Sequence, residues 1–434
     1  MKRIVRGAVL DFLSDPAADQ TAAHRYWDDG ALVVEDGKVT RVGDFDALGH
    51  ENTADALVDD YRGKLILPGF VDLHIHYAQV DIIASYGAQL LDWLERYTFP
   101  AEAKFGDSAH AAAAAEFFLD ELLRNGTTTA SVFPTIHPQS VDAFFAAARR
   151  RNMRMLAGKV MMDRNCPADL RDDLVRGEAD IRALIDRWHG KGRLGYSLTP
   201  RFAPTSSPGQ LALAARLLAE IPGLHLQTHL AENRDEVRWV AELFPEASSY
   251  TDVYVQAGLI GPRSVFAHAI HMGDADFAAL AQAGGAIAFC PTSNLFVGSG
   301  LFDLRRARAA GVRIGVGTDV GGGTSYSMLR TLAEAYKVLQ LQGVSLAPLE
   351  AFHLATLGGA QALGLDDRIG NFVAGKEADF VVLDLAATPV LARRMAVADR
   401  LEDRLFALMT LGDDRSVYAT YVLGEPDYRR DGPN

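Results

Sequence analysis

The chain of 434 residues is 49% hydrophobic and 23% charged, which is typical of folded proteins. Its length suits one large domain with a smaller companion. With 56 acidic against 43 basic residues the net charge is -13, and so acidic a chain without a basic stripe is not expected to bind nucleic acid. Two cysteines cannot form a disulfide framework, and no apolar run is long enough for a membrane span or a secretory signal. We therefore expect a cytoplasmic protein without a membrane partner.

Short β-type segments fill both ends of the chain. In residues 30–44 a Glu35-Asp36-Gly37 turn joins two alternating runs, which predicts a hairpin. Residues 371–385 and 418–428 return to the same pattern. Neither end alone could bury much core. We therefore expect residues 1–66 and 369–434 to pair as one small β-sandwich domain.

Between these ends, apolar segments rich in β-type residues alternate with helical patterns, which are clearest over 108–126 and 167–190. The eight candidate strands are residues 65–77, 127–133, 154–163, 193–200, 224–232, 264–272, 286–293 and 312–320. Strands buried on both faces and alternating with helices predict a parallel sheet, and eight of them predict a closed (β/α)8 TIM barrel over residues 67–368. A doubly wound open sheet is the competing architecture, but its GxGxxG fingerprint is absent.

Polar residues gather where the predicted barrel strands end, which is where barrel enzymes carry their chemistry. His74 and His76 end the first strand and share one face, because alternate side chains of a strand point the same way. The other strand-end residues are Arg201 and Phe202 after the fourth strand, His229 and Glu232 at the fifth, His268 at the sixth and Asp319 at the eighth. All of these side chains are expected to converge on one mouth of the barrel.

Three imidazoles and one carboxylate of this group could hold a single cation. The candidate ligands are His74, His76, His229 and Asp319. Nitrogen-rich ligation with one carboxylate suits Zn²⁺, although Fe²⁺ or Mn²⁺ would also accept it. His271 lies an odd step from His268 and should face away from the site. Since no HExxH, GxSxG, P-loop or cytidine-deaminase motif occurs, a metal-activated water is the best-supported nucleophile.

Several stretches resemble the amidohydrolase superfamily, and its mononuclear deaminase branch most closely. These are PGFVDLHIH (68–76), THLAEN (228–233), AHAIHM (267–272) and GTDVGGGTSYSM (317–328). A second, more specific set resembles the guanine deaminase family: HYAQ (76–79), LLDWLERYTFPAE (90–102), TPRFAPTSS (199–207) and CPTSNLFVGSG (290–300). The similarity runs along nearly the whole chain, and the combination of YTFPAE with PRFAPT is its most specific part.

This resemblance implies roles for individual residues. The residues that match the zinc ligands are His74, His76, His229 and Asp319. Glu232 matches the proton-shuttling carboxylate, and His268 matches the histidine that orients the attacking water. The residues that match the purine site are Gln79, Arg201, Phe202, His229, Glu232 and Asp319.

The resemblance also implies one zinc ion per subunit and a homodimer. Relatives with two metals carry a bridging lysine at the end of the fourth strand, where this chain reads YSLTPRF. Ser206 and Cys290 stand where relatives are expected to carry cysteine and serine, but neither is an expected ligand. The aromatic residues Trp93, Tyr97 and Phe99 either close over the bound base or pack in the core.

The expected reaction is the hydrolysis of guanine to xanthine and ammonia. Zinc would lower the pKa of its bound water to about 7, and Asp319 would accept the proton of that water. Glu232 would donate to the ring nitrogen beside C2, while Arg201 would face the C6 carbonyl. One alternative is a deaminase or dechlorinase of a pterin, triazine, cytosine-like or adenine-like ring, which would differ at Gln79, Arg201 and Phe202. A remoter alternative is a non-catalytic barrel that only binds.

Overall fold

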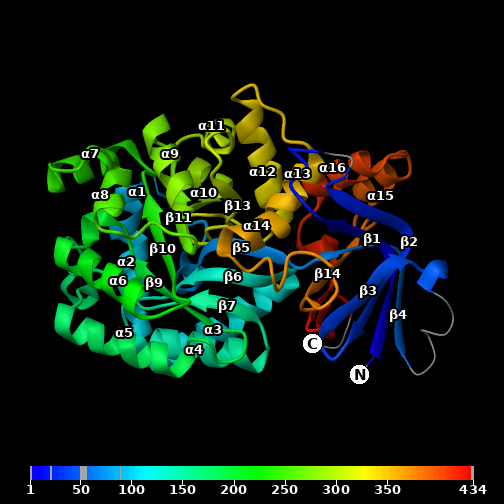
Figure 1. The fold of residues 1–434 in the computed structure, drawn as a ribbon, viewed down its shortest axis with the longest axis horizontal. Helices are drawn as coiled ribbons and strands as arrows, with labels where there is room; N and C mark the ends of the chain where they lie inside the picture. Colours follow the sequence, from blue (N-terminus) through cyan, green and yellow to red (C-terminus); the bar gives the residue numbers. More distant parts are fainter. Residues whose placement is uncertain (1, 20–21, 49–55, 88, 432–434) are drawn as a thin grey trace.

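The computed structural model describes residues 2–19, 22–48, 56–87 and 89–431 (Figure 1). Parts of the predicted terminal domain, residues 1, 20–21, 49–55 and 432–434, lie outside this range. Figure 1 shows a barrel next to a smaller sheet that carries both ends of the chain. In the described ranges, no helix combines the length and the apolar character that a membrane span requires.

Within the described residues, eight parallel strands follow one another in chain order around the barrel. They are β5 (Phe70–His76), β6 (Thr127–Phe133), β7 (Arg154–Ala157), β9 (Gly195–Pro200), β10 (His225–Leu230), β11 (Ser264–His268), β12 (Ala286–Phe289) and β13 (Arg313–Val316). The short strand β8 (Val160–Met161) also pairs with β9. The last strand approaches the first where the backbone amide of Asp319 donates to the carbonyl of His74 at 2.8 Å. The predicted (β/α)8 barrel is confirmed.

Helices surround the barrel and close one of its ends. Those on the outside are α3 (Ser108–Arg124), α4 (Pro138–Arg150), α5 (Leu174–Trp188), α6 (Pro208–Glu220), α9 (Asp274–Ala283), α11 (Leu304–Ala309), α12 (Met328–Gln340) and α13 (Pro348–Leu354). Helix α14 (Leu357–Leu363) packs Ala360 and Leu363 against Val71 and Val265, which stand at the starts of β5 and β11. The amino-terminal end of the barrel is thus filled, and the carboxyl ends of the strands carry the open face.

The elements over this open face come from the loops that follow the strands. They are α1 (Leu90–Trp93), a π-helical turn (Leu94–Thr98), α2 (Phe99–Ala103), α7 (Arg234–Leu243), α8 (Tyr250–Gln256) and α10 (Pro291–Phe296). Helix α7 begins with a capping box, in which the side chain of Asn233 caps the helix while Glu236 accepts from the backbone amide of Asn233. This cap fixes the backbone directly after Glu232.

Capping residues set the starts of the two clearest predicted helices. The side chain of Asp107 accepts from the amides of Ala109 and His110, and α3 then buries one apolar face. The predicted helix 167–190 begins later than expected, at Leu174. Its start is set by Asp173, whose carboxylate accepts from the amides of Val175 and Arg176. The apolar spacing alone did not reveal this boundary.

The smaller unit is a seven-stranded sheet with the order β16-β15-β14-β4-β1-β2-β3. In the described ranges its members are β1 (Lys2–Phe12), β2 (His24–Glu35), β3 (Lys38–Asp44), β4 (Leu57–Pro68), β14 (Phe380–Asp384), β15 (Val417–Val422) and β16 (Glu425–Arg429). The pairing of β4 with β14 unites the two chain ends, as expected. The predicted hairpin is also confirmed, with positive φ at Asp36 (49°) and Gly37 (77°) in its turn.

Two features of the small unit differ from the sequence prediction. Residues 65–77 were expected as one strand, but the chain changes sheets at Gly69, between β4 and β5. A side chain at Gly69 would lie 2.2 Å from the hydroxyl of Thr128, so this crossing requires glycine. The helices α15 (Pro389–Met395) and α16 (Leu401–Leu411) lie between β14 and β15, where the sequence analysis had indicated no helix.

A buried ionic cluster joins the barrel to the small sheet. Arg154 at the start of β7 donates to Glu377 at 2.8 Å, and Arg193 donates to the same carboxylate at 2.6 Å. Arg193 also pairs with Asp379, just before β14. All four side chains are less than a tenth exposed. Because a buried charge without a partner is costly, each member depends on the others.

Removing Arg193 should therefore destabilise the junction. We expect Arg193→Ala to lower the free energy of unfolding by about 3 kcal/mol, since Asp379 and Glu377 keep their buried charges. The matched control is Arg216→Ala, which breaks ion pairs of a half-exposed arginine and should cost less than about 1 kcal/mol. Urea unfolding followed by circular dichroism measures both. Equal losses in the two variants would contradict the role of the cluster.

Candidate active site

The strand-end residues that the sequence singled out line one buried space at the open face of the barrel. His74 and His76 lie at the end of β5, His229 is the penultimate residue of β10, and His268 is the last residue of β11. Asp319 follows β13 by three residues, with a positive φ of 51°, and His268 also has a positive φ, of 72°. Strained backbone at non-glycine residues persists only where the surroundings impose it, and it clusters at functional sites.

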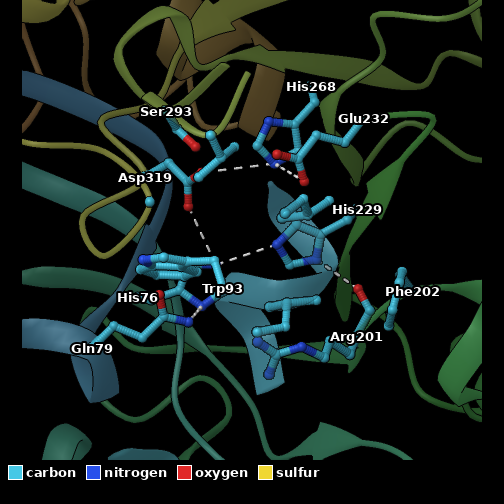
Figure 2. Close-up of a pocket in the computed structure, with 14 residues that line it drawn as sticks. His76, Gln79, Trp93, Arg201, Phe202, His229, Glu232, His268, Ser293 and Asp319 are labelled. Atoms are coloured by element: carbon cyan, nitrogen blue, oxygen red, sulfur yellow. Dashed lines mark hydrogen bonds and ion pairs between the residues drawn. The ribbon is translucent and has the colours of Figure 1, made fainter. Parts of the chain in front are cut away.

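The donor atoms of this group approach one another closely, and Figure 2 shows His76, His229, His268 and Asp319 facing one another. The Nε2 atom of His76 lies 3.3 Å from that of His74 and 3.3 Å from that of His229. One carboxylate oxygen of Asp319 lies 3.2 Å from His74 Nε2 and 3.4 Å from His76 Nε2. His268 Nε2 lies 3.7 Å from the other oxygen of Asp319. Donor atoms of His74, His76 and Asp319 all fall within 4.8 Å of one another, so this cluster could hold a metal ion.

The hydrogen bonds behind the imidazoles show which nitrogen carries the proton. Nδ1 of His229 lies 2.6 Å from the backbone carbonyl of Arg201, which can only accept. Nδ1 of His268 lies 2.8 Å from the side-chain oxygen of Asn294. In the neutral form of either ring the lone pair is then on Nε2, which faces the cluster. Among the described residues, His268 Nε2 is buried without a hydrogen bond. Converging lone pairs of this kind fit a bound cation.

Burial also decides the charge of these groups. It lowers the pKa of His74, His76 and His229 well below the ordinary value, and neighbouring imidazoles add to the effect. The rings are therefore neutral near pH 7, which is the form that binds metals. Burial raises the pKa of Asp319 to about 6. It raises the pKa of Glu232 to about 8, with the charge of Asp319 contributing.

Glu232 and His268 form the upper side of the site in Figure 2. Oε2 of Glu232 lies 3.4 Å from Nε2 of His268, and Oε1 accepts a hydrogen bond from the hydroxyl of Ser299 at 2.9 Å. The position of Glu232 is further fixed by its backbone amide, which donates to Glu236 at 2.9 Å. The carboxyl group of Glu232 is thus held in a defined position beside the cluster of histidines and Asp319.

The residues expected to hold a substrate line the same cavity. Its walls are formed by His76, Gln79, Leu90, Trp93, Leu94, Arg201, Phe202, His229, Glu232, His268, Ser293, Val297, Asp319 and Gly322. In Figure 2, Gln79 and Arg201 lie below the histidine cluster, opposite Glu232 and His268. A group bound in this cavity would therefore meet polar contacts on two sides.

The aromatic residues of 90–102 divide into two kinds. Trp93 lines the cavity, and its indole donates to the carbonyl of Ser85 at 3.3 Å. Phe99 packs in a small core with Phe133 and Ile136 and does not line the cavity. Tyr97 is half-buried outside that core. Of the three, Trp93 alone is placed to cover a ligand.

His271 faces away from the metal cluster, as its spacing predicted. Its Nε2 atom lies 2.9 Å from the carbonyl of Ser299, and its ring lines a separate hollow with Arg234 and Asn233. The serine links this histidine indirectly to Glu232. His271 is therefore no candidate ligand.

Cys290 is buried below the site, with a donor atom within 4.8 Å of those of His268 and Asp319. Burial raises the pKa of its thiol well above the ordinary value, so the neutral thiol dominates. The thiol also donates weakly to the carbonyl of Ala288, at 3.4 Å. A protonated thiol is a poor ligand, in line with its omission from the predicted set.

Sequence reasoning missed several residues that hold the site together. Asp72, fully buried in β5, accepts from the backbone amides of His74 and Thr318, each at 3.1 Å, and from the hydroxyl of Thr318. It thereby ties the first strand to the loop that carries Asp319. Its only signal was a charged residue inside the apolar run FVDLHIH. Asn294 lay in the stretch CPTSNLFVGSG, but nothing in its spacing pointed to His268.

The fold and the site together indicate the class of protein to which the chain belongs. The sequence profile of the Amidohydrolase family matches residues 65–426, which include the whole barrel. The chain belongs to the amidohydrolase family. The matched range contains every barrel strand and all residues of the histidine and aspartate cluster at the strand ends.

Within this family, the chain is most informatively compared with guanine deaminases. It is 53% identical over 430 residues to guanine deaminase of Escherichia coli (strain K12), covering 99% of this chain and 98% of that protein. The solved guanine deaminase from Bradyrhizobium japonicum is 37% identical, with a TM-score of 0.94 and coverage of 99% and 100%. The guanine deaminase from C. acetobutylicum, solved with guanine in its active site, is 28% identical, with a TM-score of 0.89 and the same coverage. The resemblance indicated by the sequence motifs is confirmed.

The candidate ligands can be tested by metal content. After dialysis, we expect the metal content per chain of His229→Ala to be lower than that of the unmodified protein by about tenfold or more, because one of four donor groups is lost. His271→Ala is the matched control and should keep its metal, since its ring lies in the separate hollow. Elemental analysis of both purified variants gives the result, with circular dichroism to check folding. Full metal in His229→Ala, or its loss in His271→Ala, would contradict the assignment.

Proposed function

We propose that this chain is a guanine deaminase, which hydrolyses guanine to xanthine and ammonia. The observation that carries the proposal is the joint placement of Gln79, Arg201 and Glu232 around the histidine cluster, in a chain that aligns with guanine deaminases over nearly its full length. The set of candidate metal ligands alone would fit many hydrolases. The polar residues on the opposite wall of the cavity, Gln79 and Arg201, are what distinguish the substrate.

The proposed metal is one zinc ion, held by His74, His76, His229 and Asp319, with Fe²⁺ as an alternative. Three nitrogens and one carboxylate suit zinc. A single ion is supported by the end of β9, where Arg201 and Phe202 stand and no lysine is available to bridge two metals. When bound, the ion would supply an activated water as the nucleophile by lowering the pKa of that water to about 7.

The side chains around the ion then handle the protons. Asp319 accepts a proton from the attacking water through the oxygen that faces His268. His268 orients that water, since its own Nδ1 is fixed by Asn294. Glu232 delivers a proton to the ring nitrogen beside C2, so that the ring can take up electrons. Glu232 then takes up the proton of the hydroxyl added at C2 and passes it to the departing amine, so that ammonia leaves, and the proton held by Asp319 restores Glu232.

Recognition of the base comes from the other wall. The Arg201 guanidinium donates to the C6 carbonyl of guanine, a position where adenine carries an amine. A donor that faces a donor leaves buried groups unpaired, so adenine is disfavoured. Gln79, whose amide nitrogen donates to Glu102, offers its amide oxygen to the ring edge as an acceptor, and the rings of Phe202 and Trp93 give flat apolar cover. His229, Glu232 and Asp319 complete the contact surface.

A substrate panel tests the proposal. The metal-loaded protein is offered guanine, adenine, cytosine and a pterin in turn, and released ammonia is measured. We expect ammonia from guanine, with kcat/KM for adenine lower by at least about 100-fold. Turnover of cytosine or a pterin with guanine inert would replace the substrate assignment, and the absence of any turnover would favour a protein that only binds.

A single substitution tests the role of Glu232. We expect Glu232→Gln to keep its metal and to lose kcat by about 100- to 10,000-fold, because the amide keeps the shape but cannot shuttle a proton. The control is Glu242→Gln, on the exposed face of α7. Steady-state rates and elemental analysis are measured on both. A rate near that of the unmodified protein would rule out the proton-shuttle role.

The assembly and location expected from the sequence also belong to this proposal. A guanine deaminase of this kind is proposed to act in the cytoplasm as a homodimer, with guanine and water as its reactants.

A further inference from the structure

Glu102 makes a buried ion pair directly behind the cavity. It lies in α2 and is fully buried, as is almost all of Arg201. Both of its carboxylate oxygens accept from Nη1 of Arg201, at 2.9 and 2.7 Å. Oε1 also accepts from the amide nitrogen of Gln79 at 3.1 Å. One carboxylate therefore holds two of the residues proposed to contact the substrate, although Glu102 itself does not line the cavity.

The pairing leaves part of the guanidinium free for a ligand. Among the described residues, Nε and Nη2 of Arg201 make no hydrogen bond, and Arg201 lines the cavity wall. Because the guanidinium is planar, fixing Nη1 fixes the directions of the remaining N–H groups. Phe99, in the same helix, has its ring centroid 5.4 Å from the guanidinium carbon. Helix α2 thus holds Arg201 from two sides.

The carboxylate also sets the charge of this wall. Without Glu102, Arg201 would be a buried cation with no ion-pair partner in contact among the described residues, and only the more distant carboxylates of Glu232 and Asp319 would offset its charge. With Glu102, the pair is neutral overall, so the wall has no excess charge to attract an anion. A neutral acceptor such as a ring carbonyl is the group that suits such a wall, because it takes a hydrogen bond without bringing charge.

The ion pair joins the two most specific sequence stretches of the chain. Glu102 is the last residue of YTFPAE, and Arg201 is the second residue of PRFAPT in the other stretch. They are 99 residues apart, and the structure brings them into contact. We propose that Glu102 is a positioning residue that orients Arg201, and thereby makes the site select purines with an oxygen at C6. This inference rests on the proposed function.

Competitive inhibition of guanine turnover separates this role from a structural one. Hypoxanthine carries the C6 oxygen and purine does not, while neither has a 2-amino group to lose. We expect Glu102→Gln to weaken inhibition by hypoxanthine at least about tenfold, since a charge-assisted bond is misaligned, and inhibition by purine by less than threefold. The exposed neighbour Glu95 provides the control Glu95→Gln, with both constants unchanged. Metal content is measured for each variant, because Gln79 also lies 3.1 Å from Nδ1 of His76.

Equal weakening of both inhibitors would mean that Glu102 only supports the fold, and no weakening would mean that it does not position Arg201. Either result overturns the inference while leaving the proposed function intact. An unmodified enzyme that releases no ammonia from guanine would instead overturn the proposed function, and this inference with it.

A double variant covers the case in which Glu102→Gln does not fold. Glu102→Gln/Arg201→Gln removes both charges and leaves no unpaired buried ion. If Glu102 acts through Arg201, the double variant should match Arg201→Gln within about twofold in its ratio of hypoxanthine to purine inhibition. A further tenfold fall in that ratio would show that Glu102 acts by another route.

Discussion

The site depends on imidazole nitrogens that converge in a buried space at the open face of the barrel. His76 Nε2 lies 3.3 Å from the same atom of His74 and of His229, with Asp319 beside them. Neutral imidazole nitrogens at these distances are held together favourably only when they share a bound cation or a proton. Several parts of the fold serve to keep them there. Asp72 ties β5 to the loop of Asp319, the carbonyl of Arg201 holds the ring of His229, and Asn294 holds that of His268.

The barrel supplies the convergence, and the loops supply the selectivity. Parallel strands bring their carboxyl ends to one face of the barrel. Side chains from β5, β10 and β11 therefore meet there as a direct consequence of the fold. The base-recognition wall is built differently. Arg201 follows β9, but its orientation comes from Glu102 and Phe99 in α2, which lies in the loop after β5. A change in that loop could alter the choice of substrate while the metal cluster stays as it is.

Much of this was accessible from the sequence, for identifiable reasons. Strand β6 has the predicted bounds, 127–133. This strand could be predicted because a run rich in β-branched residues between Gly126 and Pro134 strongly favours a strand. The placement of the strand-end histidines could be predicted in the same way, because in a (β/α)8 barrel the carboxyl ends of successive strands surround one opening. The residues proposed from strand ends lie together at that mouth, whereas Gln79, in the turn after β5, was indicated only by the family resemblance.

The remaining features depend on contacts that no local pattern records. The need for glycine at the switch of sheets comes from Thr128 of the next strand, which leaves no room for a side chain at Gly69. The helices α15 and α16 are short, and α15 has only one buried residue, so neither had a clear apolar period. Glu102 was visible as part of a motif, but its partner is 99 residues away. Sequence reasoning named the residues that face the cavity and missed the ones behind them.

The central claim is that four strand-end side chains bind one metal ion beside Glu232. The most direct measurement is an anomalous difference map from crystals of the metal-loaded protein, recorded above the absorption edge of the bound metal. The account predicts a single peak about 2.0–2.2 Å from Nε2 of His74, His76 and His229 and from an oxygen of Asp319. Two peaks, or one peak elsewhere in the molecule, would contradict it.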